Sequence, residues 1–513
     1  MGDAGGAGGN NMNIKQAKNE VKNTVKAYLS KDAHGEYVIP QIRQRPMLLI
    51  GPPGVGKTQI MEQIARECKI GLVAYTITHH TRQSAVGLPF IKEREYDGKN
   101  YSVTEYTMSE IIASVYERME ATGLKEGILF IDEINCVSET LAPTMLQFLQ
   151  CKTFGNQAVP KGWVIVAAGN PPEYNKSVRD FDMVTLDRVR YISIEADYQV
   201  WKEYARDVHI HDALLSYLEL HPNNFYRVET DVDGMNFVTA RGWEDLSNLM
   251  DVYEELGIPV DEEIIHEFLR HEDVAEDVSA YFDLYKKYQD DYGIAEILEG
   301  KVKPSVYARI DQAAFDERLS VVNLLLDGVS NVFYQIQRER EITDAWYDFL
   351  KEYRQKLKNS LQAKGIFETI LAEKTASDEQ NEKQQFVSKA QSDRARSLNE
   401  KLKECAKKIV AEETINIEET ALFALAKEPF DAQCEKLQSL ENQGIETLEH
   451  AFTFMEQAFS DGQEMVVFVT ELTITPEIAV FLSEHRIERY ETYKNQLLIG
   501  TKRAEILSEI ARD

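Results

Sequence analysis

A glycine-rich segment near the start of the chain carries the residue types best suited to chemistry. Its residues match the phosphate-loop pattern G-x-x-x-x-G-K-[ST]. Glycines let successive backbone N–H groups curl around an anion, while a lysine and a hydroxyl complete the contacts to phosphate and to Mg²⁺. We therefore expect a nucleotide-binding loop made of Gly51, Pro52, Pro53, Gly54, Val55, Gly56, Lys57 and Thr58.

The segments on either side are those that such a loop needs. The apolar run Met47–Ile50 predicts a short buried strand, and the amphipathic stretch Gln59–Arg66 predicts a helix. The positive end of the helix dipole would add to the backbone amides. In this position Lys57 can reach the β- and γ-phosphates of ATP, and Thr58 can ligate Mg²⁺.

A second apolar run delivers two carboxylates. Residues 127–131 predict a buried strand that leads directly into Asp132 and Glu133. Open parallel sheets bind ligands at the carboxyl ends of their strands. We expect Asp132 to hold the Mg²⁺ ion and Glu133 to orient and deprotonate an attacking water, which would make the protein an ATP-hydrolysing enzyme.

Two further segments supply polar side chains that could reach phosphate. Trp163–Ala168 predicts another buried strand, and Asn170, just after it, could hold the attacking water or a γ-phosphate oxygen. Farther along, Thr239 is a helix-capping residue type. A cap at this position places Arg241 in the first turn of a helix, where it could face a phosphate.

Two turn-rich segments predict β-hairpins. Asp97 and Gly98 separate alternating runs at residues 90–96 and 101–106, and Asp-Gly between such runs is a strong hairpin signal. Residues 153–162 predict a second, shorter hairpin.

In this order, the motifs resemble those of the MoxR-type AAA+ ATPases. The resemblance rests on the phosphate loop, the acidic pair within Ile131–Asn135, the Gly169–Asn170 strand end, Leu186–Arg188 and Thr239–Arg241. The two predicted hairpins look like the helix-2 and pre-sensor-1 insertions of that clade. The likeness covers residues 14–250 and implies Asn170 as sensor 1 and Arg241 as sensor 2.

The resemblance also implies an arginine finger that reaches the active site of a neighbouring subunit. Arg188 is the residue that matches this role, with Arg179 and Arg190 as alternatives. The family usually has arginine where this chain has Cys136, which leaves the set of residues acting between subunits open. A finger supplied by a neighbour requires an oligomer, so a hexameric ring is implied.

The predicted fold class is α/β. We expect an AAA+ P-loop core with three αβα layers around a parallel sheet, then an α-helical lid and an additional all-α C-terminal region. In that last region, Met465–Leu472 should be helical like its neighbours, and Ser377–Gln385 should be a mobile connection. The predicted divisions are a disordered tail at 1–13, the nucleotide-binding domain at 14–200, the lid at 201–300 and a region for partner or client binding at 301–513.

Composition limits the kinds of partner. The chain has 513 residues and a formal net charge of −29, which disfavours a broad nucleic-acid surface. No apolar run approaches the length of about 18 residues that a membrane span needs, and no signal peptide is evident, so no membrane insertion is expected. No C-x-x-C spacing occurs, which predicts reduced thiols in a cytoplasmic protein. The five cysteines are Cys68, Cys136, Cys151, Cys405 and Cys434.

Three functions are compatible with these residues. The first, implied by the resemblance, is a remodelling or maturation chaperone that acts on a von Willebrand factor A domain partner or another protein complex. The alternative is a nucleic-acid-associated motor of the same clade, which the acidic charge disfavours. A nucleotide-gated scaffold without hydrolysis is the third, and the intact Lys57, Thr58, Asp132 and Glu133 disfavour it.

Overall fold

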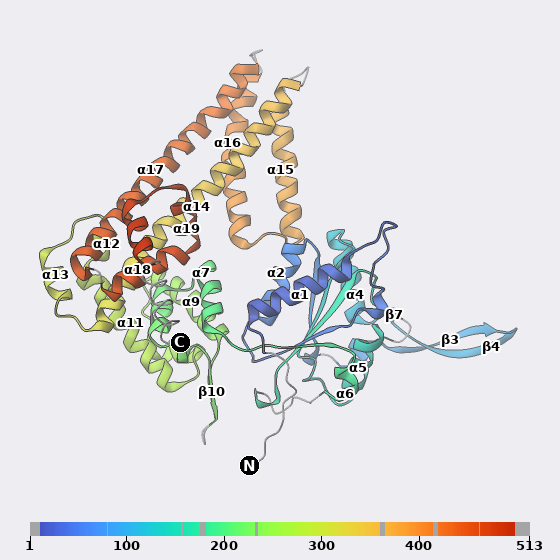
Figure 1. Cartoon of the computed structure of the whole chain (residues 1–513). Helices are drawn as coiled ribbons and strands as arrows, with labels where there is room; N and C mark the ends of the chain where they lie inside the picture. The colour runs from blue at the N-terminus through green and yellow to red at the C-terminus, as the bar shows by residue number, and fades with distance from the viewer. Residues whose placement is uncertain are drawn as a thin grey trace, which may run out of the picture. The chain divides into compact units, whose positions relative to one another are not determined.

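The computed structural model divides the chain into two units (Figure 1). Unit 1 comprises Met1–Glu203, Phe225–Asp245 and Gln380–Val387, and unit 2 comprises Tyr204–Asn224, Leu246–Glu379 and Ser388–Asp513. The structure describes residues 11–79, 81–154, 157–174, 181–230, 234–359, 365–413, 419–460 and 462–497.

Unit 1 is built on a five-stranded sheet in the order β2-β5-β8-β1-β9, in which all neighbours run parallel. This sheet confirms the predicted α/β P-loop core. Its central strand β8 is buried along its whole length, as expected for a strand covered on both faces. The strands are β1 (Met47–Ile50), β2 (Gly71–Thr76), β5 (Gly127–Asp132), β8 (Trp163–Gly169) and β9 (Arg190–Ser193).

Side chains alternate between the two faces of the sheet, and each face has its own helices. Met47 and Leu49 belong to one apolar cluster, which also contains side chains from the first two helices. Leu48 and Ile50 point to the other cluster, which contains side chains from the next three helices. The helices are α1 (Ile14–Leu29) and α2 (Lys57–Cys68) on the first face, and α3 (Arg82–Val86), α4 (Glu110–Thr122) and α5 (Ala142–Cys151) on the second.

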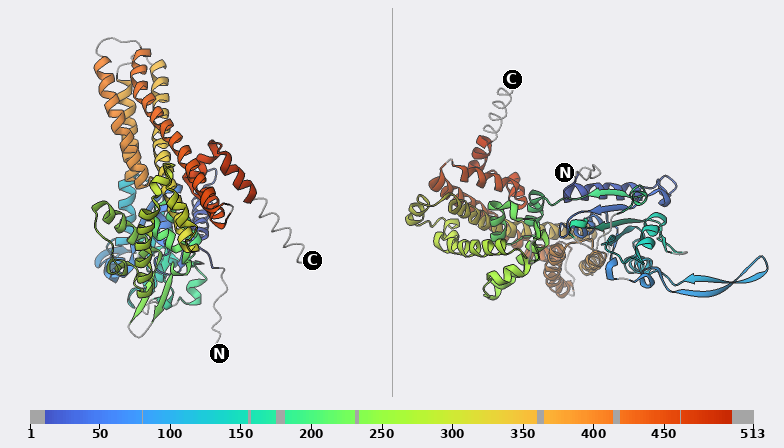
Figure 2. Two further views of the ribbon diagram at one scale, coloured as in Figure 1. Left: turned by 90° about the vertical axis from the view of Figure 1, so that its left-hand side faces the viewer. Right: turned by 90° about the horizontal axis from the view of Figure 1, so that it is seen from below.

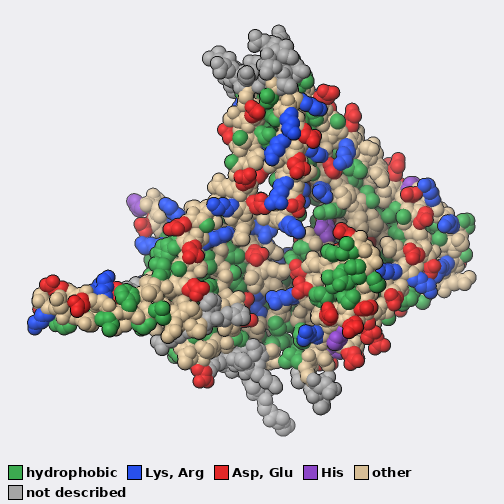
Figure 3. Space-filling view, turned by 180° about the vertical axis from the view of Figure 1, so that it is seen from behind, with side chains coloured by type: hydrophobic (Ala, Val, Ile, Leu, Met, Phe, Trp, Pro, Cys, Tyr) green, Lys and Arg blue, Asp and Glu red, His purple; other side chains and the backbone are tan. Residues whose placement is uncertain are grey.

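Both predicted hairpins are present in unit 1. β3 (Pro89–Tyr96) pairs antiparallel with β4 (Lys99–Tyr106), and the turn residues Asp97 and Gly98 both have positive φ. This hairpin projects from the rest of unit 1 (Figure 2) and exposes apolar side chains (Figure 3). The second hairpin is short, with β6 (Thr153–Phe154) paired to β7 (Gln157–Ala158).

A third hairpin was not predicted. Residues 201–300 were expected to be helical, yet β10 (Arg227–Thr230) pairs antiparallel with β11 (Met235–Val238). The alternation of apolar and polar residues in these four-residue strands is too short to stand out from its helical surroundings. The other elements that lie in or enter unit 1 are η1 (Gln41–Arg43), η2 (Ile77–His79), η3 (Pro172–Tyr174), α6 (Met183–Leu186), α7 (Tyr198–Asp207) and α9 (Ala240–Leu256).

Unit 2 is helical in its described residues. Met465–Leu472 lies within α18, which confirms the helix expected there. Four of the helices, α14 to α17, share one apolar cluster and lie side by side in Figures 1 and 2. The elements are α8 (Asp212–Leu220), η4 (Pro222–Asn224), α10 (Glu262–Phe268), α11 (Glu272–Tyr292), α12 (Ile294–Leu298), α13 (Pro304–Ile310), α14 (Phe315–Asn359), α15 (Ile366–Lys383), α16 (Lys389–Glu413), α17 (Glu419–Phe459), α18 (Gln463–Ile474) and α19 (Pro476–Glu484).

Two expectations need correction. Ser377–Gln385 was expected to be a mobile connection, but α15 continues to Lys383 and the side chain of Gln384 is buried, donating a hydrogen bond of 2.7 Å to the Thr122 carbonyl. The second expectation was that no apolar run approaches the length of a membrane span. Helix α14 nevertheless contains an 18-residue window with a mean hydropathy of 1.2, which is as long and apolar as a membrane span. In the structure 56% of that window is buried, as is typical of a core helix in a helical bundle.

Candidate nucleotide-binding site

The phosphate loop joins β1 to α2, so the strand and the helix predicted around it are both present. Gly56 is the N-cap of α2, and α2 begins at Lys57, two residues earlier than predicted. Gly54 and Gly56 have φ values of +74° and +92°. Residues with side chains rarely adopt this left-handed conformation, which explains why the loop needs glycine at these two positions.

Lys57 is buried within the loop and bonded to neutral oxygens. Its Nζ donates hydrogen bonds of 2.8 Å to the carbonyls of Gly51 and Pro52, and one of 2.9 Å to Oδ1 of Asn170. Burial lowers the pKa of Lys57 from 10.5 to about 8, although Asp132 opposes this effect. The loop therefore holds a cation whose charge is only partly compensated, and an anion bound there would stabilise it.

The two carboxylates stand at the end of β5, beside the loop. Thr58 donates a hydrogen bond of 3.3 Å to Oδ2 of Asp132, and Oδ1 of Asp132 accepts one of 2.9 Å from the backbone N–H of Glu133. Glu133 itself has a φ of +58°, which is unusual for a residue with a side chain. This strained position is typical of active sites.

Sequence reasoning missed the partner of Glu133. Thr78, in η2, donates a hydrogen bond of 2.6 Å to Oε2 of Glu133. The preceding strand β2 pairs with β5 so that Thr76 lies opposite Asp132, which brings the residues after both strands to one edge. Thr78 could have been found only by predicting that β2 neighbours β5.

Asn170 lies at the same edge, at the exit of β8. Its backbone carbonyl accepts a hydrogen bond of 2.8 Å from Nδ2 of Asn135, which is itself buried. Gly169 leaves the space for Asn135, because a β-carbon on Gly169 would lie 2.3 Å from Oδ1 of Asn135. Asn135 therefore fixes the backbone of Asn170, a role that sequence reasoning did not assign.

Arg241 approaches the loop from the start of α9. Thr239 caps this helix, accepting a hydrogen bond of 3.2 Å from the N–H of Gly242, which confirms the predicted cap. A β-carbon built on Gly54 would lie 3.5 Å from Cβ of Arg241. The charge of Arg241 also contributes to the lowered pKa of Lys57.

The candidates for the arginine finger differ in their surroundings. Arg188 follows α6 and is exposed. Arg190, in β9, donates a hydrogen bond of 2.7 Å to Thr24 and forms an ion pair with Glu20, both in α1. Arg179 lies outside the described residues. Thus Arg190 is bonded to helix α1 of the same chain, and Arg188 lies at the surface.

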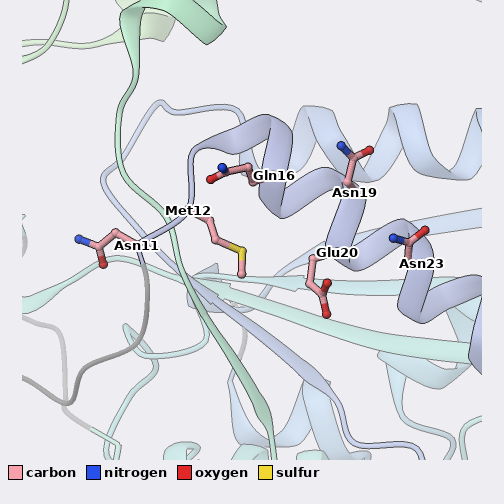
Figure 4. Close-up of a pocket in the computed structure, with 6 residues that line it drawn as sticks. All are labelled: Asn11, Met12, Gln16, Asn19, Glu20 and Asn23. Atoms are coloured by element: carbon pink, nitrogen blue, oxygen red, sulfur yellow. The ribbon is translucent and has the colours of Figure 1, made fainter. Parts of the chain in front are cut away.

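A separate hollow of about 500 Å³ lies beside α1 (Figure 4). No residue of the phosphate loop lines it, and neither carboxylate does. Amide side chains predominate, with Gln16 engaged in a capping box with Asn13 at the start of α1. The hollow is therefore distinct from the nucleotide-binding site.

Residues 47–186 match the family of ATPases associated with various cellular activities (AAA). The match begins with β1 and ends with α6, so it includes the phosphate loop, both carboxylates and Asn170. The five-stranded parallel sheet fits the P-loop core of such ATPases, and the match makes residues 47–186 similar to an AAA-family ATPase domain.

Among solved structures, the chain resembles a provisionally named ATPase from Cytophaga hutchinsonii. The two share 16% sequence identity with a TM-score of 0.24, and the alignment covers 38% of this chain and 51% of that one. The chain therefore spans about half the length of this protein. No curated protein matches the chain.

Proposed function

We propose that unit 1 binds ATP with Mg²⁺ and hydrolyses it. The observation that carries this proposal is the convergence of three elements at one sheet edge. There the buried Lys57 bonds both to its own loop and to Asn170, while Thr58 bonds to Asp132. A cation enclosed by glycine-rich backbone, with a hydroxyl and a carboxylate beside it, fits the triphosphate of a nucleotide and its metal ion.

The residues present suit Mg²⁺. Within the described part of the chain, no group of three or more His, Cys, Asp or Glu side chains could hold a metal on its own. Mg²⁺ needs no such cage, because it commonly binds one or two protein oxygens together with phosphate oxygens and waters. Thr58 and Asp132 would supply the protein oxygens, and the ion would neutralise charge on the β- and γ-phosphates.

The remaining side chains would act on the γ-phosphate and on water. Lys57 would exchange its bonds to the Gly51 and Pro52 carbonyls for phosphate oxygens. Glu133, oriented by Thr78, would position and deprotonate the attacking water. Asn170 would then hold the water or a γ-phosphate oxygen, and Arg241 would contact phosphate from the start of α9.

We further propose that the site is completed by a neighbouring subunit in a ring, most simply a hexamer. Arg188 is exposed and lies two residues beyond the range 47–186 that matches the AAA family, whose members commonly assemble in this way. An arginine at the transition state can raise the rate by about 10³-fold or more. The isolated subunit would accordingly be a weak ATPase.

For the biological role, we propose a MoxR-type remodelling or maturation chaperone whose client is a von Willebrand factor A domain protein or another protein complex. The order of the motifs and the two hairpins, β3–β4 and β6–β7, support this assignment. A nucleic-acid motor of the same clade is the alternative, and the net charge of −29 counts against it. Stimulation of ATP turnover by single-stranded DNA would favour the motor over the chaperone.

The experiment for the ATPase compares Glu133→Gln with wild type and with Glu120→Gln, which changes an exposed carboxylate of α4. We expect Glu133→Gln to bind ATP and release almost no phosphate, while Glu120→Gln behaves as wild type. Proteins that co-purify with ATP-loaded Glu133→Gln would identify the client. Phosphate release at the wild-type rate from Glu133→Gln would contradict the role of Glu133.

A further inference from the structure

One segment of the chain returns to unit 1 between two stretches of unit 2. This segment, Phe225–Asp245, contains the unpredicted hairpin β10–β11 and the start of α9. Its two ends are joined, because the fully buried Trp243 donates a hydrogen bond of 2.9 Å from Nε1 to the Phe225 carbonyl. The hairpin therefore projects from a closed loop within unit 1.

Both ends of the hairpin contact the phosphate loop, and they do so at adjacent residues. Tyr226, just before β10, donates a hydrogen bond of 2.9 Å from its hydroxyl to the Pro53 carbonyl. Thr239, just after β11, packs so closely on Gly54 that a β-carbon there would lie 2.9 Å from Cβ of Thr239. The two contacts join residues that are more than 170 positions apart in the sequence.

The contact at Pro53 controls the direction of a loop amide. The Pro53 carbonyl and the Gly54 N–H belong to one planar peptide unit and point in opposite directions. Gly54 has a φ of +74°, and glycine is the residue type that most readily allows the peptide before it to adopt another orientation. By holding the carbonyl, the Tyr226 hydroxyl fixes the direction of the Gly54 N–H, one of the amides that a phosphate-binding loop can offer.

The Tyr226 side chain is itself held in place. Its ring meets the ring of Tyr174 edge to face, with centroids 6.5 Å apart and an interplanar angle of 80°. Tyr174 belongs to η3, which closely follows Asn170. Burial also raises the pKa of Tyr226, so the hydroxyl keeps its proton at neutral pH and remains a donor.

We propose that Tyr226 is a positioning residue for the phosphate loop and that it couples the conformation of the hairpin β10–β11 to nucleotide binding at the loop. This inference rests on the proposed binding of ATP. A loop held in its binding conformation loses less entropy when the nucleotide binds, so the hydroxyl raises affinity. Because coupling of binding equilibria is reciprocal, bound nucleotide in turn steadies the hairpin.

The test uses Tyr226→Phe, which removes only the hydroxyl, with Tyr116→Phe on the exposed face of α4 as the matched control. Titration with a fluorescent ADP analogue gives the Kd, and steady-state turnover gives kcat and KM. Loss of one hydrogen bond predicts a two- to tenfold rise in Kd, on the order of 0.5–1.5 kcal/mol. The kcat value at saturating ATP should stay within about twofold of wild type, since Tyr226 contacts no reacting atom.

Hydrogen–deuterium exchange without nucleotide supplies an independent readout. In Tyr226→Phe we expect the peptides that cover residues 51–58 and 227–238 to exchange faster than in wild type. In Tyr116→Phe these peptides should exchange at the wild-type rate. Tyr174→Leu, which removes the ring that supports Tyr226, should shift Kd and exchange in the same direction.

Each outcome bears on the proposal. Exchange and Kd in Tyr226→Phe that equal those of wild type would overturn it, and so would faster exchange confined to the hairpin. If wild type binds no nucleotide while Tyr226→Phe still loosens residues 51–58, the proposed ATPase function fails and the structural tie between Tyr226 and the loop stands.

Discussion

The buried charge of Lys57 should lower the unfolding free energy of the nucleotide-free protein. Replacing Lys57 by methionine should restore part of this free energy. A fall in pKa from 10.5 to about 8 in the native state corresponds to about 3 kcal/mol of destabilisation. Methionine fills a similar volume without a charge. It leaves the Gly51 and Pro52 carbonyls without this donor, which costs about 1 kcal/mol or more. We expect Lys57→Met to be more stable by about 1–2 kcal/mol at pH 7.

The sign of the pH dependence follows from the lowered pKa. Between about pH 8 and 10.5 the unfolded chain binds more protons at Lys57 than the native protein does, so the unfolding free energy of wild type rises with pH in this window. Below pH 8 both states are protonated and the penalty is fully present. The advantage of Lys57→Met should therefore be constant below about pH 8 and should shrink above it. By pH 10.5 the variant should be less stable than wild type by about 1 kcal/mol, because the charge penalty is then nearly gone and the cost of the lost hydrogen bonds remains.

The assay is urea unfolding followed by tryptophan fluorescence at pH 7 and pH 9.5. Three of the four tryptophans, Trp163, Trp201 and Trp243, lie in unit 1, so the signal reports mainly on the unit that holds Lys57. Lys26→Met, on the exposed side of α1, is the matched control and should change stability little at either pH. Lys57→Met should at the same time lose ATP binding. A less stable Lys57→Met at pH 7, or a stability difference that does not change with pH, would refute the reasoning.

Three further predictions concern the surroundings of the site. Thr78→Val should lower kcat by about two- to tenfold with little change in KM, because Glu133 loses the hydrogen bond that orients it. Thr78→Ser keeps the hydroxyl and should restore the rate. Equal rates in both variants would contradict this role of Thr78. Asn135→Ala should lower the unfolding free energy by about 1–3 kcal/mol in urea titrations, because it leaves the Asn170 carbonyl without its donor. The control Asn19→Ala, on the surface of α1, should have almost no effect. Arg188→Ala mixed into wild type should reduce turnover more than in proportion to its share, and a linear decrease would argue against a finger acting between subunits.

The motifs that carry the chemistry were predictable from local sequence. An apolar strand, a glycine-rich turn with Lys57, and a helix follow one another within a few residues, so their types and spacing alone predict the loop. The same holds for the strand that ends in Asp132 and for Thr239, whose capping position follows from its neighbours in the chain. The hairpin at Asp97 and Gly98 needed only its turn residues and the alternation on either side.

Contacts between distant segments decided the rest. Nearby sequence predicts neither the hydrogen bond from Thr78 to Glu133 nor the one from Asn135 to Asn170. Each depends on which strands become neighbours in the sheet. Tyr226 reaches Pro53 only because the segment Phe225–Asp245 returns to unit 1.

The sequence by itself therefore determined that a phosphate loop, two carboxylates and an α/β core are present, since these follow from short-range pattern. The tertiary structure decided what orients them. Hydrogen-bond partners such as Thr78, Asn135 and Tyr226 are set by the order of strands and the path of the chain. The spacing of residues along the chain does not show either of these, because the residues that form these hydrogen bonds lie from 35 to 173 positions apart in sequence.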